Sequence, residues 1–358
     1  MEKSCRFTVE RVLGCTRNDT ENDYSNSFLE VGELPIISQE QEFINGYWND
    51  ASDLFKVNKP VVIFGDHTQV LKYVDFDFVL GADGVKILQP IKDLYPKFFY
   101  YFLTRVEFKT LGYARHYRLL KDIDVPLPPL AEQQRIVAIL DEAFADIAVA
   151  KASAETNLQN ARELFDSVLG SVFANPSDEW EEKKLNAICE NLDNKRIPVT
   201  KRDRENGEYP YYGASGIVDY VSQYIFDEDL LLVSEDGANL LARTYPIAFS
   251  ISGKSWVNNH AHVLRFKDKA SQRFTEYYLN GINLRPYVSG MAQPKLNQQM
   301  LNSIVVPFPK LSTQQSIVAK LDALSLETKK LETIYRQKLA DLDELKKSVL
   351  QKAFSGDL

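Results

Sequence analysis

The sequence predicts an α/β (α+β) protein in which two similar globular domains alternate with two long antiparallel helices. A motif occurs twice without a gap, at residues 125–141 and 306–322, and such a repeat constrains the whole fold. Each copy opens a stretch without proline or glycine that runs to Gly170 or Gly356, and a strand-rich block precedes each copy. We therefore expect domain one at 1–125, a first helix at 126–175, domain two at 176–306 and a second helix at 307–358.

Both copies of the motif read Pro-x-Pro-x-Leu-x-x-Gln-Gln-x-Ile-Val-Ala-x-Leu-Asp. Proline lacks a backbone N–H and favours an extended residue before it, so each helix should begin after the Pro-x-Pro segment. Ser312 is the expected N-cap of the second helix.

The two helices carry heptad-like apolar patterns, which favour a coiled coil over ordinary surface helices. The predicted seam of the first helix follows Ile136, Leu140, Ala143, Ile147, Ala150, Ala154, Asn157, Ala161, Leu164 and Val168. That of the second follows Ile317, Leu321, Leu324, Thr328, Leu331, Tyr335, Lys338, Leu342, Leu345 and Val349. Antiparallel pairing would set small residues against large ones and place Asn157 opposite Thr328 as a polar layer that fixes the register.

The two blocks share one layout of strands, turns and a helix. Domain one has apolar runs at 34–37, 60–64 and 85–88, followed by an aromatic helical stretch at 95–104. In domain two, 208–212 matches the first run, 229–233 the second and 274–279 the helix. Because the blocks are otherwise only loosely alike, they indicate one duplicated scaffold whose working surfaces have diverged.

Composition indicates a soluble globular protein of a reducing compartment. The chain is 44% hydrophobic and 26% charged, without an apolar run long enough for a bilayer or an N-terminal signal segment. Cys5, Cys15 and Cys189 lack metal-ligand spacing, and we expect free thiols and a cytoplasmic location. A net charge of −8 argues mildly against nucleic acid if it is spread evenly, but a basic face can hide in such a sum.

The duplicated motif and long helices resemble the specificity subunit (HsdS) of type I restriction–modification systems. The segments 180–185, 211–216 and 290–297 also fit that family, whereas domain one has 112–118 in place of the last segment and lacks the opening tryptophan. The resemblance implies a non-catalytic subunit whose two target recognition domains each read half of a split DNA sequence. It implies that the helices set the spacing and dock two methylase (HsdM) subunits, with restriction (HsdR) subunits as further candidate partners. The methylase would use S-adenosylmethionine to methylate adenine, so we expect no cofactor in this chain.

Candidate DNA contacts in domain two are cations and amides, because DNA binding needs Lys or Arg for phosphates and forked donors for base edges. The basic loop at 195–204 holds five cations and one acid, a plausible phosphate clamp or else an ordinary solvated loop. The turn-rich segment at 234–239 could present Asn239 and Arg243 to a groove of DNA, or form a tight surface hairpin. The candidates are Lys195, Arg196, Lys201, Arg202, Arg204, Asn239, Arg243, Lys254, Gln293 and Lys295.

Domain one offers fewer candidates. The segment 65–69 occupies the place of 234–239, and His67, Thr68 and Gln69 are its candidate contacts. The most basic stretch of the block supplies Arg115, His116, Tyr117 and Arg118.

Two tempting motifs indicate no catalytic or metal centre. Ser252-Gly253-Lys254-Ser255 echoes a P-loop, but Ala248 stands where its first glycine belongs. His260 and His262 lie on one strand face without an evident third ligand, so core or surface histidines are expected. No Asn/Asp-Pro-Pro-Tyr/Phe motif marks an amino-methyltransferase.

Apolar residues outside the seams suggest partner docking, because an exposed apolar stripe usually marks an interface. The predicted docking residues are Arg135, Phe144, Leu158, Phe165, Leu326 and Ile334. An alternative function is a protein-binding scaffold or decoy with a degenerate DNA surface, which a weak dependence of DNA affinity on salt would reveal.

Overall fold

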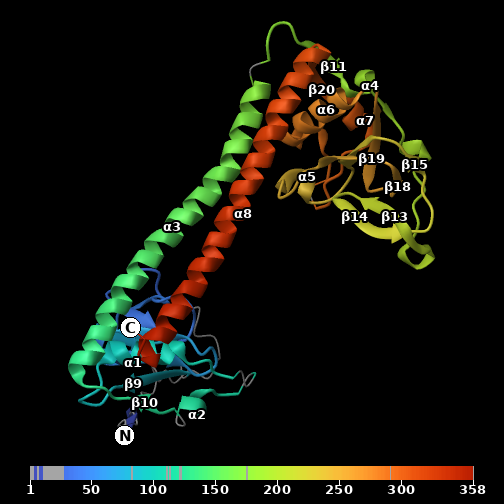
Figure 1. The fold of residues 1–358 in the computed structure, drawn as a ribbon. Coiled ribbons are helices and arrows are strands. Elements are labelled where there is room, and N and C mark those ends of the chain that lie inside the picture. The colour runs from blue at the N-terminus through green and yellow to red at the C-terminus, as the bar shows by residue number, and fades with distance from the viewer. Residues whose placement is uncertain are drawn as a thin grey trace. The chain divides into compact units, whose positions relative to one another are not determined.

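A computed structural model of the protein describes residues 4–5, 8–10, 28–81, 84–109, 112, 114–120, 123–174, 176–290 and 292–357. The chain divides into two compact units, each of which combines one globular domain with segments of both long helices. Unit one comprises Met1–Ala154 and Lys338–Leu358, and unit two comprises Glu155–Gln337 (Figure 1). Among the described residues, no helix combines the length and the apolar character needed to cross a membrane.

Domain one is a three-layered arrangement of one helix and two sheets. Its strands are β1 (Ser4–Cys5), β2 (Thr8–Glu10), β3 (Leu34–Ile37), β4 (Tyr47–Trp48), β5 (Leu54–Phe55), β6 (Val61–Gly65), β7 (Leu71–Val74), β8 (Phe78–Leu80), β9 (Val85–Gln89) and β10 (Val125–Pro126). One sheet has the order β2-β9-β6-β7, a second has β4-β3-β8-β5, and β1 pairs with β10. The pair β3–β8 is parallel, while the other pairs in these sheets are antiparallel.

The central strand β6 is buried on both faces, which explains its unbroken apolar run. Val62 and Phe64 point toward α1 (Pro96–Arg105), where they share a core with Phe98. Val61 and Ile63 point the other way, into a core shared with the second sheet. The short helix α2 (Tyr117–Leu120) follows, and η2 (Ala51–Asp53) is a single 3-10 turn.

Domain two repeats this topology, so that each strand of domain one corresponds to the strand whose label is ten higher. Its strands are β11 (Glu181–Lys184), β12 (Cys189–Asn191), β13 (Asn206–Gly213), β14 (Gly216–Val221), β15 (Phe226–Asp227), β16 (Leu230–Ser234), β17 (Ala248–Ile251), β18 (Lys254–Val257), β19 (Ala261–Phe266) and β20 (Val305–Phe308). The orders are β12-β19-β16-β17, β14-β13-β18-β15 and β11-β20, with β13 and β18 parallel. The predicted duplication of one scaffold is therefore confirmed at the level of every sheet.

The helices of domain two are α4 (Leu185–Ile188), α5 (Asn239–Ala242), α6 (Lys269–Gly281) and α7 (Gln298–Ser303), with 3-10 turns η3 (Asp193–Lys195), η4 (Lys201–Asp203) and η5 (Arg285–Tyr287). α6 takes the place of α1 on the β16 sheet, where Phe274 packs with Leu231 and Val233. Opposite faces of β16 again serve two cores, since Leu230 and Leu232 pack with Val257 instead.

The two long helices are α3 (Leu130–Ala174) and α8 (Leu311–Ser355), coloured green and red in Figure 1. Their first backbone bonds run from Glu132 N–H to Pro129 O and from Thr313 N–H to Lys310 O, both 2.9 Å. Lys310 is therefore the N-cap and Ser312 lies inside the first turn, so its prediction as N-cap was wrong by two residues.

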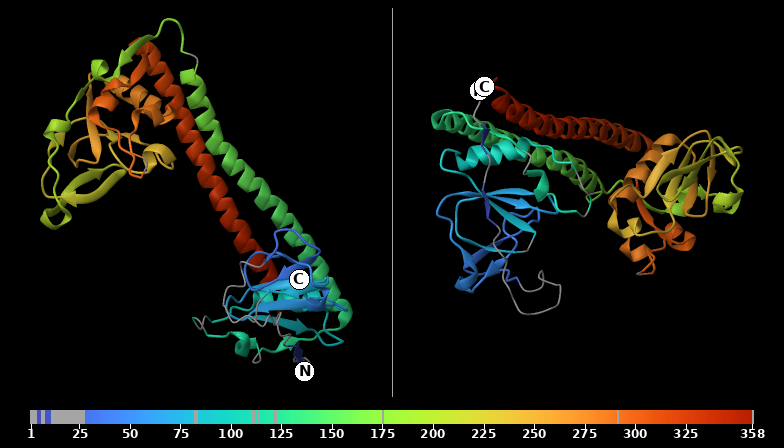
Figure 2. Two further views of the ribbon diagram at one scale, coloured as in Figure 1. Left: turned by 180° about the vertical axis from the view of Figure 1, so that it is seen from behind. Right: turned by 90° about the horizontal axis from the view of Figure 1, so that it is seen from below.

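The helices run antiparallel, side by side within each unit (Figures 1 and 2). In unit one, Lys151 Nζ lies 2.6 Å from Asp343 Oδ1. In unit two, Arg162 Nε lies 3.4 Å from Glu332 Oε2. The coiled-coil fold expected from the heptads is thus confirmed, although these exposed pairs add little stability by themselves.

The seam of α3 departs from its predicted path at Asn157 and Leu164, while Ala154 and Ala161 are buried as predicted. Asn157 and Leu164 are exposed, whereas their neighbours Leu158 and Phe165 are half-buried. The predicted polar layer is therefore wrong, and the Thr328 hydroxyl instead donates within its own helix to the carbonyl of Leu324. After Ile147 the observed seam advances by four and then three residues, whereas the predicted seam advances by three and then four. The observed order places the larger apolar side chains of Leu158 and Phe165 in the seam.

Candidate nucleic-acid interface

In domain one, two surface segments are joined by the carboxylate of Asp66, which directly follows β6. Asp66 is only 1% exposed, and its Oδ2 lies 3.8 Å from Lys86 Nζ on β9 and 4.0 Å from Arg115 Nε. The Tyr117 N–H donates to Asp66 Oδ1 (2.7 Å), and the His116 N–H donates to the Asp66 carbonyl (2.8 Å). This buried acid therefore ties the β6–β7 loop to the segment that leads into α2.

The β6–β7 loop carries the predicted contacts His67, Thr68 and Gln69. His67 and Thr68 are exposed, and the Thr68 hydroxyl donates to the carbonyl of Gln39 (2.5 Å). Gln69 is half-buried and has a φ of 62°, a left-handed conformation that few non-glycine residues adopt. The loop is thus a tight turn with His67 and Thr68 on its outside.

The segment 115–118 contains both outward and inward side chains. The Arg115 side chain is 59% exposed and Arg118 is exposed as well. His116 is 1% exposed, and its Nδ1 donates to the Asp66 carbonyl at 2.9 Å. Burial and the nearby Asp66 raise the pKa of Tyr117 above its ordinary value. Of the four residues predicted here to contact DNA, Arg115 and Arg118 are on the surface, while His116 holds the segment in place from below.

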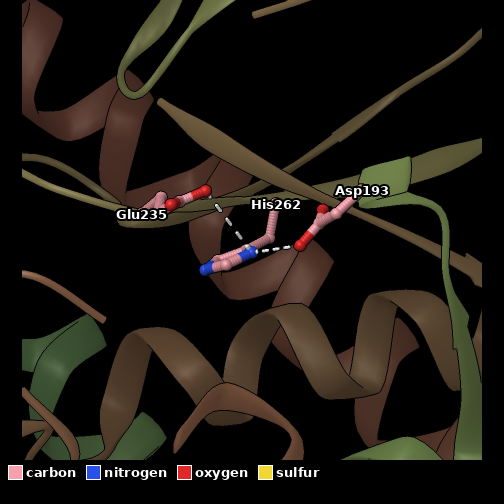
Figure 3. Close-up of side chains that lie close together, drawn as sticks. All are labelled: Asp193, Glu235 and His262. Atoms are coloured by element: carbon pink, nitrogen blue, oxygen red, sulfur yellow. Dashed lines mark hydrogen bonds and ion pairs between the residues drawn. The ribbon is translucent and has the colours of Figure 1, made fainter. Parts of the chain in front are cut away.

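Domain two has an acid in the same position as Asp66. Glu235 follows β16, and its carboxylate lies 2.7 Å from Arg196 Nη1 and 3.2 Å from Lys295 Nζ. His262 Nδ1 lies 2.6 Å from Asp193 Oδ2 and 3.8 Å from Glu235 Oε2, as Figure 3 shows. The cluster joins η3, the end of β16, the start of β19 and the segment before α7.

The backbone around the two acids is the same. The Asp66 N–H donates to Gly84 O (2.7 Å) in domain one, and the Glu235 N–H donates to His260 O (2.9 Å) in domain two. The Leu296 N–H donates to Glu235 O at 2.8 Å, as the His116 N–H does to Asp66 O. Arg115 and Lys295, which precede these donors, are therefore equivalent cations, each paired with a buried acid.

The predicted basic loop of domain two divides into two groups. Lys195, Lys201 and Arg202 are exposed and form no salt bridge within the described residues. Arg196 is held in the acid cluster with a side chain 13% exposed. Arg204 stacks on the Tyr211 ring (4.2 Å to its centroid) and pairs with Asp219 at 3.0 Å. Three of the five cations are thus available to a phosphate backbone.

Asn239 and Arg243 are engaged inside the protein. The amide of Asn239 donates to Tyr245 O (2.9 Å), and its Oδ1 accepts from the Thr244 N–H (3.0 Å). Arg243 donates to Ile282 O (2.6 Å) beyond the end of α6, and burial lowers its pKa below the usual value. These two side chains hold the short helix α5 and the turn after it, between β16 and β17, so the segment is neither an exposed contact loop nor a tight hairpin.

The remaining candidates in domain two are exposed. Lys254 lies over the rings of Tyr224 (4.8 Å) and Tyr209 (5.6 Å), while Gln293 and Lys295 lie in the segment that Glu235 anchors. The P-loop echo at 252–255 is a turn between β17 and β18 in which Gly253 has a φ of 77°, a strand-end turn as expected.

Asp193, Glu235 and His262 come close enough together to be considered as metal ligands. The cations Arg196 and Lys295 already pair with the two carboxylates. A divalent ion would add two positive charges beside them, so the group is better explained as an ion-pair cluster. Burial alone would raise the pKa of Asp193, but hydrogen bonds from His262 and the Val263 N–H and the charge of Arg196 lower it overall.

The predicted docking residues on the helices also fall into two groups. Leu326 and Ile334 are 55% and 58% exposed, and Arg135 is on the surface, paired with Glu132 at 2.7 Å. Phe144, Leu158 and Phe165 are half-buried. Phe144 packs edge-on against Tyr101 (5.3 Å) and Phe165 lies 6.1 Å from Tyr277, so these two rings join a helix to its own domain.

A repeated attachment between helix and domain was missed by the sequence analysis. In unit one, Asp141 accepts a hydrogen bond from Tyr101 (2.5 Å) and pairs with Lys97 (2.7 Å). In unit two, Asp322 accepts from Tyr277 (2.5 Å) and pairs with Arg273 (2.9 Å). A cation and a tyrosine four residues apart in each domain, together with the aspartate that ends each motif, were the available signals.

Cys189 is a free, half-buried thiol, and burial raises its pKa to about 12, so it is not a reactive thiolate. Cys15 and the side chain of Cys5 lie outside the described residues.

Comparisons with known proteins identify the family. Residues 15–156 and 177–339 match the model of the type I restriction modification DNA specificity domain. The chain is 36% identical over 189 residues to a putative type I restriction enzyme specificity subunit of Haemophilus influenzae, an alignment that spans 48% of this chain and only 49% of that protein. It is 24% identical over 333 residues to the EcoR124I/EcoR124II specificity subunit of Escherichia coli, covering 84% of this chain and 80% of that one.

Two solved structures have a similar fold. The HsdS subunit of Thermoanaerobacter tengcongensis matches with a TM-score of 0.57 and 18% identity, over 99% of this chain and 95% of that one. A chain from a study of complex assembly and conformational transition in a type I restriction–modification system matches with a TM-score of 0.70 and 17% identity, over 91% and 92%. Both halves of the sequence and the whole fold agree, and the chain belongs to the family of type I restriction–modification DNA specificity domains, of which it carries two copies.

Proposed function

We propose that this chain is the non-catalytic, sequence-reading subunit of a type I restriction–modification complex. The observation that carries the proposal is a duplication: two family matches fall on two domains with identical strand order. Each domain reads one half of a split DNA target, and α3 and α8 set the distance between the halves.

The face that reads DNA is formed by the loops anchored on Asp66 and Glu235. In domain one, Arg115 and Arg118 bind phosphates, and His67 and Thr68 lie beside them as candidates for base edges. Among the cations of domain two that were predicted to contact DNA, the exposed ones are Lys195, Lys201, Arg202, Lys254 and Lys295, with Gln293 as a forked amide. Phosphate contacts set the position of each domain, and the base contacts give the sequence preference.

The helices offer the same docking feature in each unit, which supports two methylase (HsdM) subunits. Unit one exposes Leu130 and Leu345 (48% and 47%), and unit two exposes Leu311 and Leu164 (46% and 48%). Leu130 corresponds to Leu311 in the sequence repeat, and Leu164 corresponds to Leu345. S-adenosylmethionine would be bound by the methylase, restriction (HsdR) subunits are further candidate partners, and the complex would act on cytoplasmic DNA.

Co-expression with methylase subunits from the same genome, followed by mapping of N6-methyladenine in host DNA, tests the proposal. We expect a motif of two short fixed blocks around a free spacer. A stable complex that leaves the DNA unmethylated would instead favour a scaffold or decoy.

The spacing role has its own test. Removing one heptad from each helix keeps the seam in phase and shortens the coiled coil by about 10 Å, which is roughly three base pairs of DNA. We expect the preferred spacer to change while both half-sites stay the same. A change in the half-sites with an unchanged spacer would contradict the ruler.

A further inference from the structure

The buried basic side chain beside Asp66 in domain one differs from the one beside Glu235 in domain two. Strand pairing places Lys86 opposite Phe64 and His262 opposite Val233, which is the same position in the two equivalent sheets. Domain one thus has a lysine under its recognition loops, and domain two has a histidine. Both side chains are almost completely buried, at 4% and 1% exposure.

The contacts of His262 define its charge. Nδ1 lies 2.6 Å from a carboxylate oxygen of Asp193, and Nε2 lies 2.7 Å from the carbonyl oxygen of Leu296. A carbonyl oxygen only accepts hydrogen bonds, and so does an ionised carboxylate. Asp193 Oδ2 also accepts from the Asn191 amide at 3.1 Å and lies 3.5 Å from Arg196 Nη2, as an ionised carboxylate does. Both ring nitrogens of His262 must therefore donate, which requires the doubly protonated imidazolium.

Charged groups face His262 from each element packed against it. Asp193 comes from η3 and Glu235 from the end of β16, while Arg196 pairs with both of these acids and Lys295 pairs with Glu235. On the strand of His262 itself, His260 pairs with Asp236 (2.8 Å) at the surface. Two acids and two cations therefore surround the ring.

We propose that His262 is a positioning residue for the DNA-reading loops of domain two and holds them only as an imidazolium, so that recognition of the second half-site weakens as pH rises while recognition of the first does not. The inference rests on the proposed function, which places these loops against DNA. Loss of one proton leaves a ring lone pair facing either Asp193 or the Leu296 carbonyl. Leu296 adjoins Lys295 and lies near Gln293, so the released contact loosens the segment that presents both side chains to DNA.

The first test uses the unaltered full chain in complex with its methylase subunits. The probes are three duplexes: one with the motif found by methylation mapping, and two in which either half-site is scrambled. The affinity ratio between intact and scrambled duplexes is measured from about pH 6 to about pH 9, where histidine ordinarily loses its charge and lysine keeps it. We expect discrimination at half-site two to fall by about tenfold, as for one lost charged contact, and discrimination at half-site one to stay constant. Equal profiles at the two half-sites would overturn the proposal.

Two exchanges between the domains sharpen the test. His262→Lys gives domain two a buried lysine, as domain one has in Lys86. It should make discrimination at half-site two independent of pH. Lys86→His should introduce a pH dependence at half-site one. His260→Asn is the matched control, because His260 is the other histidine of this strand, and its loss should leave the wild-type profile unchanged. If His260→Asn abolishes the pH dependence, the role belongs to His260 and the proposal for His262 is wrong.

The charge of the His262 ring can also be measured directly in the unaltered protein. The chain has four histidines, so a histidine-labelled sample gives few ring signals in an NMR spectrum. We expect one buried ring to be doubly protonated at neutral pH, and His262→Gln to remove that signal. A neutral ring at this position contradicts the proposal.

Failure of the proposed function has a different signature. Arg115→Gln and Lys295→Gln should each weaken binding of the intact duplex if these loops touch DNA. If neither variant changes affinity, the recognition face lies elsewhere. If both weaken binding but the two half-sites show the same pH profile, the face is right and the role of His262 is wrong.

Discussion

Domain one and domain two differ in how the helix on each sheet is capped. α1 has no side-chain cap of its own, and the amide of Gln133 on α3 accepts the Tyr95 N–H at 2.7 Å. α6 is capped by Asp268, which accepts the Ser271 N–H at 2.8 Å. Gln314, the counterpart of Gln133, is buried, and its Oε1 has no hydrogen-bond partner among the described residues. The same motif glutamine therefore has a full set of partners in one domain and an incomplete set in the other.

The comparison shows which parts of a duplicated scaffold resist divergence. Main-chain hydrogen bonds around Asp66 and Glu235 are the same in the two domains, whereas the bases, caps and loop side chains around them differ. Backbone groups must be paired whatever the sequence, so the frame persists while side chains exchange roles.

The largest difference is expected from the buried acids. Asp66→Ala removes the buried carboxylate that faces Lys86 and accepts the Tyr117 N–H, and we expect it to lower the free energy of unfolding of domain one by about 3–5 kcal/mol. Glu235→Ala should cost domain two less, because Asp193 remains beside Arg196 and His262. Urea unfolding of the full chain measures both effects. Trp48 reports on domain one when Trp180 and Trp256 are replaced by phenylalanine, and equal losses in the two domains would contradict the comparison.

Second in size is the effect of the motif glutamines. Gln133→Met removes bonds to Tyr95 N–H, Asp93 O and Pro128 O, and should destabilise unit one by about 2 kcal/mol. Gln314→Met removes one bond, to Pro309 O, and relieves an unpaired buried oxygen, so it should cost less than about 1 kcal/mol. Thermal unfolding of the two variants provides the measurement, and Asp268→Ala is the control for the cap of α6.

A smaller effect is expected on DNA binding by the basic loop. Lys201→Gln and Arg202→Gln should each lower affinity severalfold and reduce the salt dependence of binding by about one unit per lost phosphate contact. Lys330→Gln removes an exposed charge from α8 and should leave the slope unchanged. Titrations at several salt concentrations test this, and unchanged slopes in the loop variants would exclude the loop as a phosphate clamp.

The smallest effect concerns alkaline pH. Burial and the Asp141 carboxylate raise the pKa of Tyr101, and burial and Asp322 raise that of Tyr277. Burial, with nearby charges, also raises the pKa of Tyr73 to about 12. Because these folded-state values exceed the unfolded one, the stability they contribute is complete below about pH 10 and is lost as the pH rises further. Tyr101→Phe and Tyr277→Phe should make this loss shallower in alkaline unfolding curves, and an unchanged slope would rule out the two tyrosines as its source.

The sequence predicted the elements better than it predicted the site. Repeats and proline punctuation located both long helices and the matching strands, because those signals depend on local chemistry. Asn239 and Arg243 looked like surface contacts, yet they bind carbonyl oxygens that only the folded chain brings near. The roles of Asp66 and Glu235 depend on pairing between β6 and β9 and between β16 and β19, which spacing along the chain does not reveal.

The core of domain one includes Leu350 and Ala353 from the end of α8, and Phe354 packs on Phe98 at 5.0 Å. During synthesis, these residues leave the ribosome after all of domain two. Unit two is one continuous segment, Glu155–Gln337, and all of its residues are made before Lys338. The domain that is translated first is therefore the last whose core can close, and until then its aromatic face is uncovered in the growing chain.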